Sequence, residues 1–175
     1  YKPNFNALSL KNRKTKTIGI LIPNMLNYFF AQVFNGIEKV ANERGYKIIS
    51  CISNESFQKE VETIEMLSNG SIDGFILSIA EETLLKKDYK HFEDIIDNGT
   101  PIVMFDRVAE NIKCDKVITD DFNGAVNAVQ HLTKTGHKNI AFVSTISNLN
   151  IGQKRKLGYL KGLELGNLDI NKNLI

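Results

Sequence analysis

A few aromatic and charged residues in this sequence have the chemistry to bind a polar small molecule. Phe29 and Phe30 follow the first long apolar run, Asp106 follows a later one, and Arg155 lies in the last third of the chain. Flat rings pack against C–H faces, a carboxylate accepts hydrogen bonds from hydroxyl groups, and a guanidinium donates them in a fork. We therefore predict a binding site for a sugar or a similar polar metabolite.

Each of these residues also has a purely structural interpretation, which the sequence leaves open. Phe30 fits the apolar stripe of a helix, so one of the two adjacent rings can simply pack in the core. Asp106 can cap a loop, and Arg155 can be an ordinary surface arginine.

Motifs that catalysis on nucleotide-binding folds requires are missing from the sequence. The turn after the first apolar run, residues 22–30, has no glycine, so neither G-x-G-x-x-G nor a P-loop can bring backbone amides to a phosphate. No G-x-S-x-G elbow is present, and no histidine has a partner at metal-ligand spacing. We read the histidines as surface or packing residues: His91, His131 and His137. The sequence therefore predicts no enzyme activity, no cofactor and no metal site.

Strand-like apolar runs alternate along the chain with segments of helical periodicity. The predicted strands are residues 17–22, 47–52, 74–78, 102–105, 116–119 and 140–144. The predicted helices are residues 30–41, 57–68, 88–96 and 122–132, the last one capped by Asp121, and a further helix begins near Ile151. Strands that recur every roughly 25–30 residues with helices between them indicate right-handed βαβ units. The predicted fold class is α/β, with a doubly wound parallel sheet.

The predicted sheet places the candidate residues at one edge. In such sheets, ligands bind at the carboxyl ends of the strands. The segments that follow the strands are residues 23–30, 78–81, 106–107 and 119–121, together with the segment after Ser144. We expect these loops to form the binding site.

Charge is unevenly distributed along the chain. Residues 1–16, called here the basic leader, contain five basic residues and no acidic one, so subtracting +5 from the net charge of +2 leaves −3 for residues 17–175. This asymmetry suggests that only the leader meets a polyanion, although a solvated basic tail is the alternative. The apolar runs are too short to span a membrane. Cys51 and Cys114 are read as free thiols of a cytoplasmic protein.

Short motifs occur in order along nearly the whole chain. They are Y-K-P-N-F-N-A-L-S-L at 1–10, T-I-G-I at 17–20, N-Y-F-F at 27–30, I-D-G-F-I at 72–76, F-D-R at 105–107, D-F-N-G at 121–124, G-H-K-N-I at 136–140 and R-K-L-G-Y at 155–159. In their order and spacing they resemble the motifs of LacI/GalR transcription regulators. The residue after Ala7 departs from the family pattern, because Leu8 stands where arginine is common.

The resemblance implies a fold with two Rossmann-like lobes around an effector cleft, like type I periplasmic binding proteins. It implies a hinge at residues 1–16 after a missing helix-turn-helix head, an N-terminal lobe at 17–119, and the start of an incomplete C-terminal lobe at 120–175. The sequence is therefore expected to be a fragment of a longer protein.

The resemblance also assigns roles to individual residues. Effector contacts are implied for Asn27, Phe29, Phe30, Ser78, Asp106 and Arg155. Hinge contacts with operator DNA are implied for Asn4, Ala7 and Leu10, and Leu10 would enter the minor groove as a wedge. The expected protein is an effector-controlled, homodimeric repressor without membrane contact, whose effector is a carbohydrate. The alternative is a periplasmic sugar-binding protein of an ABC transporter, but the hinge motif and the basic leader favour the regulator.

Overall fold

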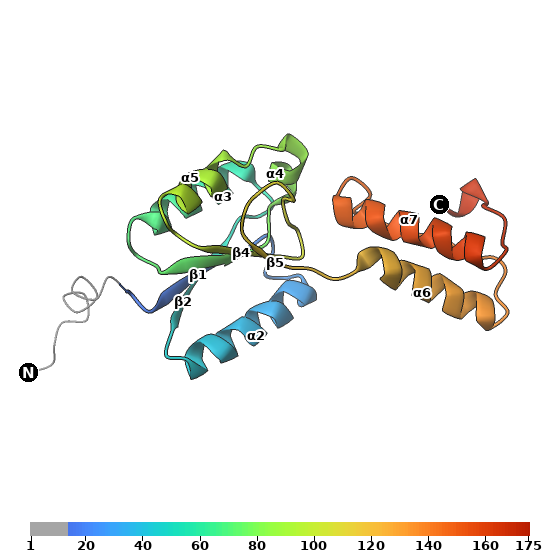
Figure 1. Cartoon of the computed structure of the whole chain (residues 1–175), viewed down its shortest axis with the longest axis horizontal. Helices are drawn as coiled ribbons and strands as arrows, with labels where there is room; N and C mark the ends of the chain where they lie inside the picture. The colour runs from blue at the N-terminus through green and yellow to red at the C-terminus, as the bar shows by residue number, and fades with distance from the viewer. Residues whose placement is uncertain (1–13) are drawn as a thin grey trace, which may run out of the picture. The chain divides into compact units, whose positions relative to one another are not determined.

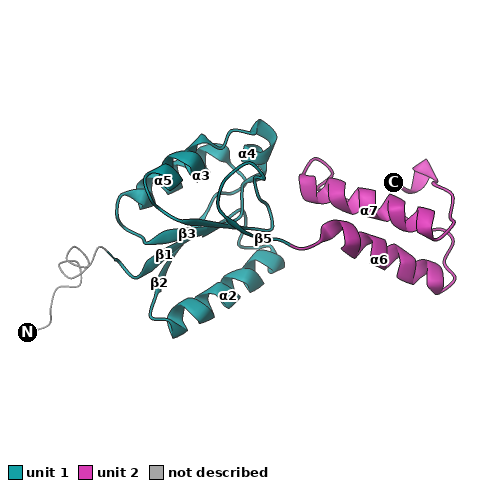
Figure 2. Ribbon diagram, in the orientation of Figure 1, with its two compact units in different colours: residues 1–118 teal, residues 119–175 magenta. Residues whose placement is uncertain are grey.

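The computed structural model describes residues 14–175. The chain divides into two compact units, residues 1–118 (unit 1) and residues 119–175 (unit 2), shown in different colours in Figure 2. The predicted hinge contacts Asn4, Ala7 and Leu10 lie outside the described residues. The assignment of the two units to lobes of an effector-binding domain stays a prediction.

Unit 1 is built on a five-stranded parallel sheet with strand order β2-β1-β3-β4-β5. The strands are β1 (Thr17–Ile22), β2 (Lys47–Ile52), β3 (Gly74–Leu77), β4 (Ile102–Phe105) and β5 (Asp115–Val117). Every neighbouring pair is parallel, so each connection must cross back over the sheet. The doubly wound α/β fold predicted from the sequence is confirmed.

Helices cover both faces of this sheet (Figure 1). They are α2 (Tyr28–Glu43) on one face and α3 (Phe57–Ser68) and α5 (Lys90–Asp97) on the other, with the short α4 (Glu81–Lys86) near the end of β3. Two clusters of buried residues lie against the strands, one including Phe75, Phe92 and Met104 and the other including Phe30 and Phe105. Burial on both faces explains why the central strands β1, β3 and β4 read as continuous apolar runs.

Unit 2 consists of α6 (Asp121–Lys134), α7 (Asn150–Leu165) and a final 3₁₀ turn, η1 (Lys172–Leu174). Glycines let the two long helices approach closely. A Cβ atom added at Gly162 would lie 2.6 Å from Cβ of Val129, closer than real Cβ contacts allow. Tyr159 is buried beside this contact, and its hydroxyl group donates a hydrogen bond to the carbonyl of Ile140 at 2.8 Å.

The prediction of a strand at residues 140–144 is wrong, because the described structure has no strand there. No strand occurs in unit 2, and the N–H of Phe142 donates to the carbonyl of Leu174 at 2.8 Å outside any ladder. Burial still alternates along the segment, with Ile140 buried and Val143 90% exposed. A strand exists only when a second extended segment pairs with it, and the described part of unit 2 supplies none.

Several boundaries also differ from those predicted. Asp120, rather than Asp121, caps α6, because its carboxylate accepts a hydrogen bond from the N–H of Asn123 at 3.0 Å. Helix α4 was not predicted, since six residues are too few to show helical periodicity. Strand β3 ends before Ser78. Strand β5 begins one residue earlier than the strand predicted at residues 116–119, and it ends two residues earlier.

Helices long and apolar enough to cross a membrane are not found between residues 14 and 175.

Candidate ligand-binding site

The first turn of α2 places the two adjacent phenylalanines in different environments. Asn27 caps α2 by accepting a hydrogen bond from the N–H of Phe29 at 3.0 Å. Phe29 is 45% exposed, whereas Phe30 is 2% exposed and packs against Ile20, Ile22 and Phe105. The two rings meet edge to face, with centroids 5.3 Å apart. Phe29 therefore offers a ring to a ligand, and Phe30 is the member of the pair that packs in the core.

The loop after β4 begins with a left-handed residue. Asp106 has φ of +58°, a region that residues with side chains rarely adopt, and its N–H donates to the carbonyl of Val117 at 3.1 Å. Such a conformation costs on the order of 1 kcal/mol and persists only where the surroundings hold it. Aspartate tolerates this conformation better than most residues, and the position directly after β4 is what makes Asp106 a candidate for the binding site.

Arg107 joins the loops at this edge of the sheet, and the sequence analysis did not assign it a role. Its Nη1 lies 2.7 Å from Oε2 of Glu55, and its guanidinium lies 5.8 Å from the centroid of the Phe30 ring. Its carbonyl accepts a hydrogen bond from the N–H of Ile79 at 3.2 Å. Arg107 thus ties together the loops that follow β1, β2, β3 and β4. Its position in the F-D-R motif was the available signal.

Ser78 follows β3 but does not reach the surface of unit 1. It is fully buried, and its hydroxyl group has no hydrogen-bond partner among the described residues. Ser53 at the end of β2 is also fully buried, with an unpartnered hydroxyl group. An unsatisfied buried hydroxyl costs about 1–3 kcal/mol. Ser78 can bind a ligand only if the surrounding loop opens.

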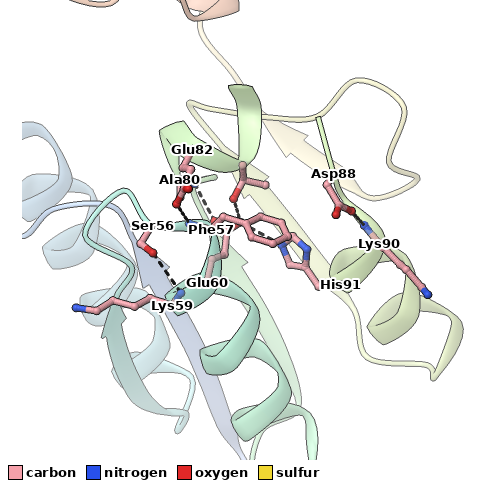
Figure 3. A network of polar contacts seen from close by, with 10 residues as sticks. Ser56, Phe57, Lys59, Glu60, Ala80, Glu82, Asp88, Lys90 and His91 are labelled. Atoms are coloured by element: carbon pink, nitrogen blue, oxygen red, sulfur yellow. Dashed lines mark hydrogen bonds and ion pairs between the residues drawn. The ribbon is translucent and has the colours of Figure 1, made fainter. Parts of the chain in front are cut away.

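A buried carboxylate fixes the loop that carries Ser78 (Figure 3). Glu60 on α3 is fully buried, and its Oε2 accepts a hydrogen bond from the N–H of Ala80 at 2.7 Å. Its Oε1 accepts from the hydroxyl group of Thr83 at 2.7 Å and lies 3.1 Å from Nε2 of His91. The network connects α3, α4 and α5 behind the predicted site.

His91 is a packing histidine, one of the two readings given by the sequence, and it also has a polar partner. It is 7% exposed and lies between the rings of Phe57 and Phe92. The Nε2 atom of His91 is the ring nitrogen that faces the Glu60 carboxyl group. The other ring nitrogen, Nδ1, faces the interior without a partner in residues 14–175.

Arg155 lies in unit 2, where it is paired with a buried carboxylate. Its Nε lies 2.7 Å from Oδ1 of Asp121, and the exposed fractions of the two side chains are 47% and 9%. The pair borders a largely apolar pocket of about 390 Å³ lined by α6, α7 and residues 140–142, and its lining includes Ala125, Val129 and Tyr159. The arginine is therefore oriented by the protein and still exposes part of its guanidinium.

The predicted residues thus fall into two groups. Unit 1 brings together Asn27, Phe29 and Phe30. Contacts of Phe30 with Phe105 and Arg107 add the start of the Asp106 loop to this group. Unit 2 holds Arg155. In the part of the chain that the structure covers, no group of three or more His, Cys, Asp and Glu side chains could hold a metal ion.

Comparison with known proteins identifies the family. The model described as periplasmic binding proteins and sugar binding domain of the LacI family matches residues 15–169. Catabolite control protein A of Priestia megaterium is 31% identical over 176 residues, which cover all of this chain and 52% of that protein. The PurR repressor of Vibrio campbellii is also 31% identical, over all of this chain and 51% of that protein.

A solved structure from Burkholderia thailandensis, assigned as a ribose operon repressor, has the same fold. It superposes with a TM-score of 0.82 at 24% identity, covering 91% of this chain and 59% of that one. This chain spans about half the length of the curated relatives that it matches. The motifs predicted this outcome, and the chain belongs to the family of periplasmic binding proteins and LacI-type sugar-binding domains.

Proposed function

We propose that this chain is the effector-binding part of a LacI-type transcription regulator that binds operator DNA. The observation that carries the proposal is the extent of the similarity. The alignments with catabolite control protein A and PurR cover the whole chain, including the basic leader that precedes the matched binding domain. A leader with five basic residues and no acidic one suits a polyanion. It favours the regulator over the periplasmic transport protein and over an enzyme.

The effector that we propose for these side chains is a carbohydrate or a similar hydroxyl-rich metabolite. Phe29 offers an exposed ring, Asp106 supplies a carboxylate in a strained turn, and Arg155 supplies an oriented guanidinium. Phe30 shapes the site from the core by packing beneath Phe29 and Arg107. Asn27 completes the proposed contact set, and Ser78 joins it only when the loop that buries it opens.

The DNA-binding role is assigned to the hinge motif. Asn4, Ala7 and Leu10 contact the operator, with Leu10 as the minor-groove wedge. A two-fold operator requires two hinges side by side, so the regulator acts as a homodimer. Because a bacterial regulator meets operator DNA in the cytoplasm, the proposed location of the protein is the cytoplasm. Sedimentation of the full-length protein at tens of micromolar tests the dimer, and a strict monomer contradicts it.

Two experiments on the full-length protein test the function. In the first, the protein is mixed with a random pool of DNA duplexes, and we expect repeated selection to enrich a two-fold sequence. In the second, a thermal-shift screen of sugars and purines should find a compound that raises the melting temperature, because ligands stabilise the folded state that they bind. A sugar that binds without any enriched duplex would favour the transport protein.

A further inference from the structure

The amino edge of the sheet in unit 1 holds the last residues of the basic leader. Asp73 directly precedes β3, and its Oδ1 accepts hydrogen bonds from the N–H of Thr15 at 2.6 Å and from the Thr15 hydroxyl group at 2.8 Å. Its Oδ2 accepts from the N–H of Lys16 at 3.0 Å. One carboxylate therefore receives three donors from two consecutive residues, at the point where the leader meets β1.

The segment that enters β2 holds the same part of the leader. The N–H of Lys47 donates to the carbonyl of Lys16 at 2.7 Å, and Nζ of Lys16 lies 4.4 Å from the centroid of the Tyr46 ring. Strand β1 lies between β2 and β3 in the sheet. Residues 15 and 16 are therefore held from both neighbouring strands.

The backbone at this point makes a sharp turn. Lys16 has φ of +53°, in the left-handed region that a lysine adopts only when surrounding contacts hold it. The N–H of Thr17 donates to Oγ1 of Thr15 at 3.2 Å, which closes the turn from inside. The backbone of Thr15 and Lys16 is thus held by contacts with residues distant in sequence, above all Asp73.

We propose that Asp73 is a positioning residue for DNA binding, whose carboxylate latches Thr15 and Lys16, the residues through which the leader joins β1. The inference rests on the proposed function, because it takes the leader to be the part that meets DNA. Asp73 itself is not a DNA contact, since its negative charge would repel phosphate. Without the latch Thr15 and Lys16 lose their fixed conformation, and DNA binding must then order them at an entropic cost.

The test replaces the carboxylate by an amide of the same shape, Asp73→Asn. We expect the amides of Thr15 and Lys16 to exchange with solvent about tenfold faster, because a charged acceptor forms stronger hydrogen bonds than a neutral one. Binding to the duplex that the wild-type full-length protein enriches from a random pool should weaken by roughly threefold to tenfold at fixed salt. Thr15→Val, which removes only the hydroxyl bond, should change both quantities in the same direction and by less.

The matched control is Asp94→Asn, which removes the same charge from an exposed position on α5. Removal of a negative charge alone makes the protein more basic and should leave DNA affinity equal or slightly higher. If Asp73→Asn lowers DNA affinity, the loss of negative charge therefore does not explain the change, because that loss alone would raise affinity or leave it the same.

Three results decide the matter. Unchanged exchange at Thr15 and Lys16 in Asp73→Asn would overturn the latch. Faster exchange with unchanged duplex affinity would overturn its positioning role. If the wild-type protein enriches no duplex, the proposed function fails instead, and the exchange measurement still decides whether Asp73 holds the leader.

Discussion

Replacement of Glu60 is the most direct test of how the loop behind the predicted site is held. The carboxylate is fully buried and receives donors from Ala80, Thr83 and His91 at 2.7, 2.7 and 3.1 Å. In Glu60→Gln one oxygen is kept and the other becomes an NH₂ group. At least one of the three groups around the carboxylate then faces this NH₂ group, which donates hydrogen bonds, instead of an accepting oxygen. The hydroxyl group of Thr83 can rotate to accept, but the N–H of Ala80 cannot.

His91 limits how well the glutamine can adapt. For Nε2 to accept from the new NH₂ group, a neutral imidazole must carry its proton on Nδ1, which has no hydrogen-bond partner in residues 14–175. A hydrogen bond to a charged group contributes about 1.5–3 kcal/mol, against about 0.5–1.5 kcal/mol for a neutral one. Weakening three such bonds should lower the free energy of unfolding by about 2–4 kcal/mol. Glu60→Ala, which leaves all three donors unsatisfied and opens a cavity, should cost about 3–5 kcal/mol.

The assay is urea unfolding of the 175-residue chain, with amide exchange of β3 as the probe specific to unit 1. Glu65→Gln is the matched control, because Glu65 lies exposed on the same helix and should change the free energy by less than about 0.5 kcal/mol. A Glu60→Gln variant as stable as this control would refute the reasoning. It would mean that the interior near Glu60 admits water or relaxes, so that the carboxylate is not needed.

The remaining predictions concern the binding site, the helix contact in unit 2 and the response to pH. Asp106→Ala or Arg155→Ala in the full-length protein should weaken binding of the identified effector by roughly tenfold or more in calorimetry, since each lost charged hydrogen bond is worth about 1.5–3 kcal/mol. Unchanged affinity in both variants would place the site in other loops. Gly162→Ala should destabilise unit 2 by about 1–3 kcal/mol in urea unfolding, because the added methyl group overlaps Val129; a more stable variant would show that the helices can separate. Partial burial acts to raise the pKa of Asp73, but the hydrogen bonds from Thr15 and Lys16 outweigh it and hold this pKa below its ordinary value. The contribution of Asp73 to stability should therefore be full above its unfolded pKa of about 4 and be lost as the pH falls through the lower folded value. Asp73→Asn should remove that dependence, and an unchanged pH profile of unfolding would contradict this.

The sequence by itself determined the fold class, most of the elements and the family. Apolar runs of strand length and helical stripes depend only on residues close together in the chain, so their periods identify β1 to β4 and the long helices directly. Gly45 and Gly136 mark where α2 and α6 give way to left-handed turns, at φ of +72° and +92°. The ordered motifs carried the family assignment, because their spacing reflects the whole fold.

Only the tertiary structure decided which of the candidate residues are accessible. Phe29 and Phe30 are neighbours on α2 with the same chemistry, and only the Phe30 ring is buried, in a cluster with Phe105. Ser78 directly follows a strand in the sequence, yet in the fold it is fully buried. The segment at residues 140–144 alternates as a strand would, but no second strand pairs with it in the described part of unit 2.

The same holds for the contacts that fix the loops. Glu60 and His91 are 31 residues apart, and Asp73 and Thr15 are 58 apart. A carboxylate in a sequence looks the same whether it is solvated or accepts three buried donors. Its role depends on which backbone groups the sheet and helices bring to it, and local periodicity does not carry that information because those groups come from distant parts of the chain.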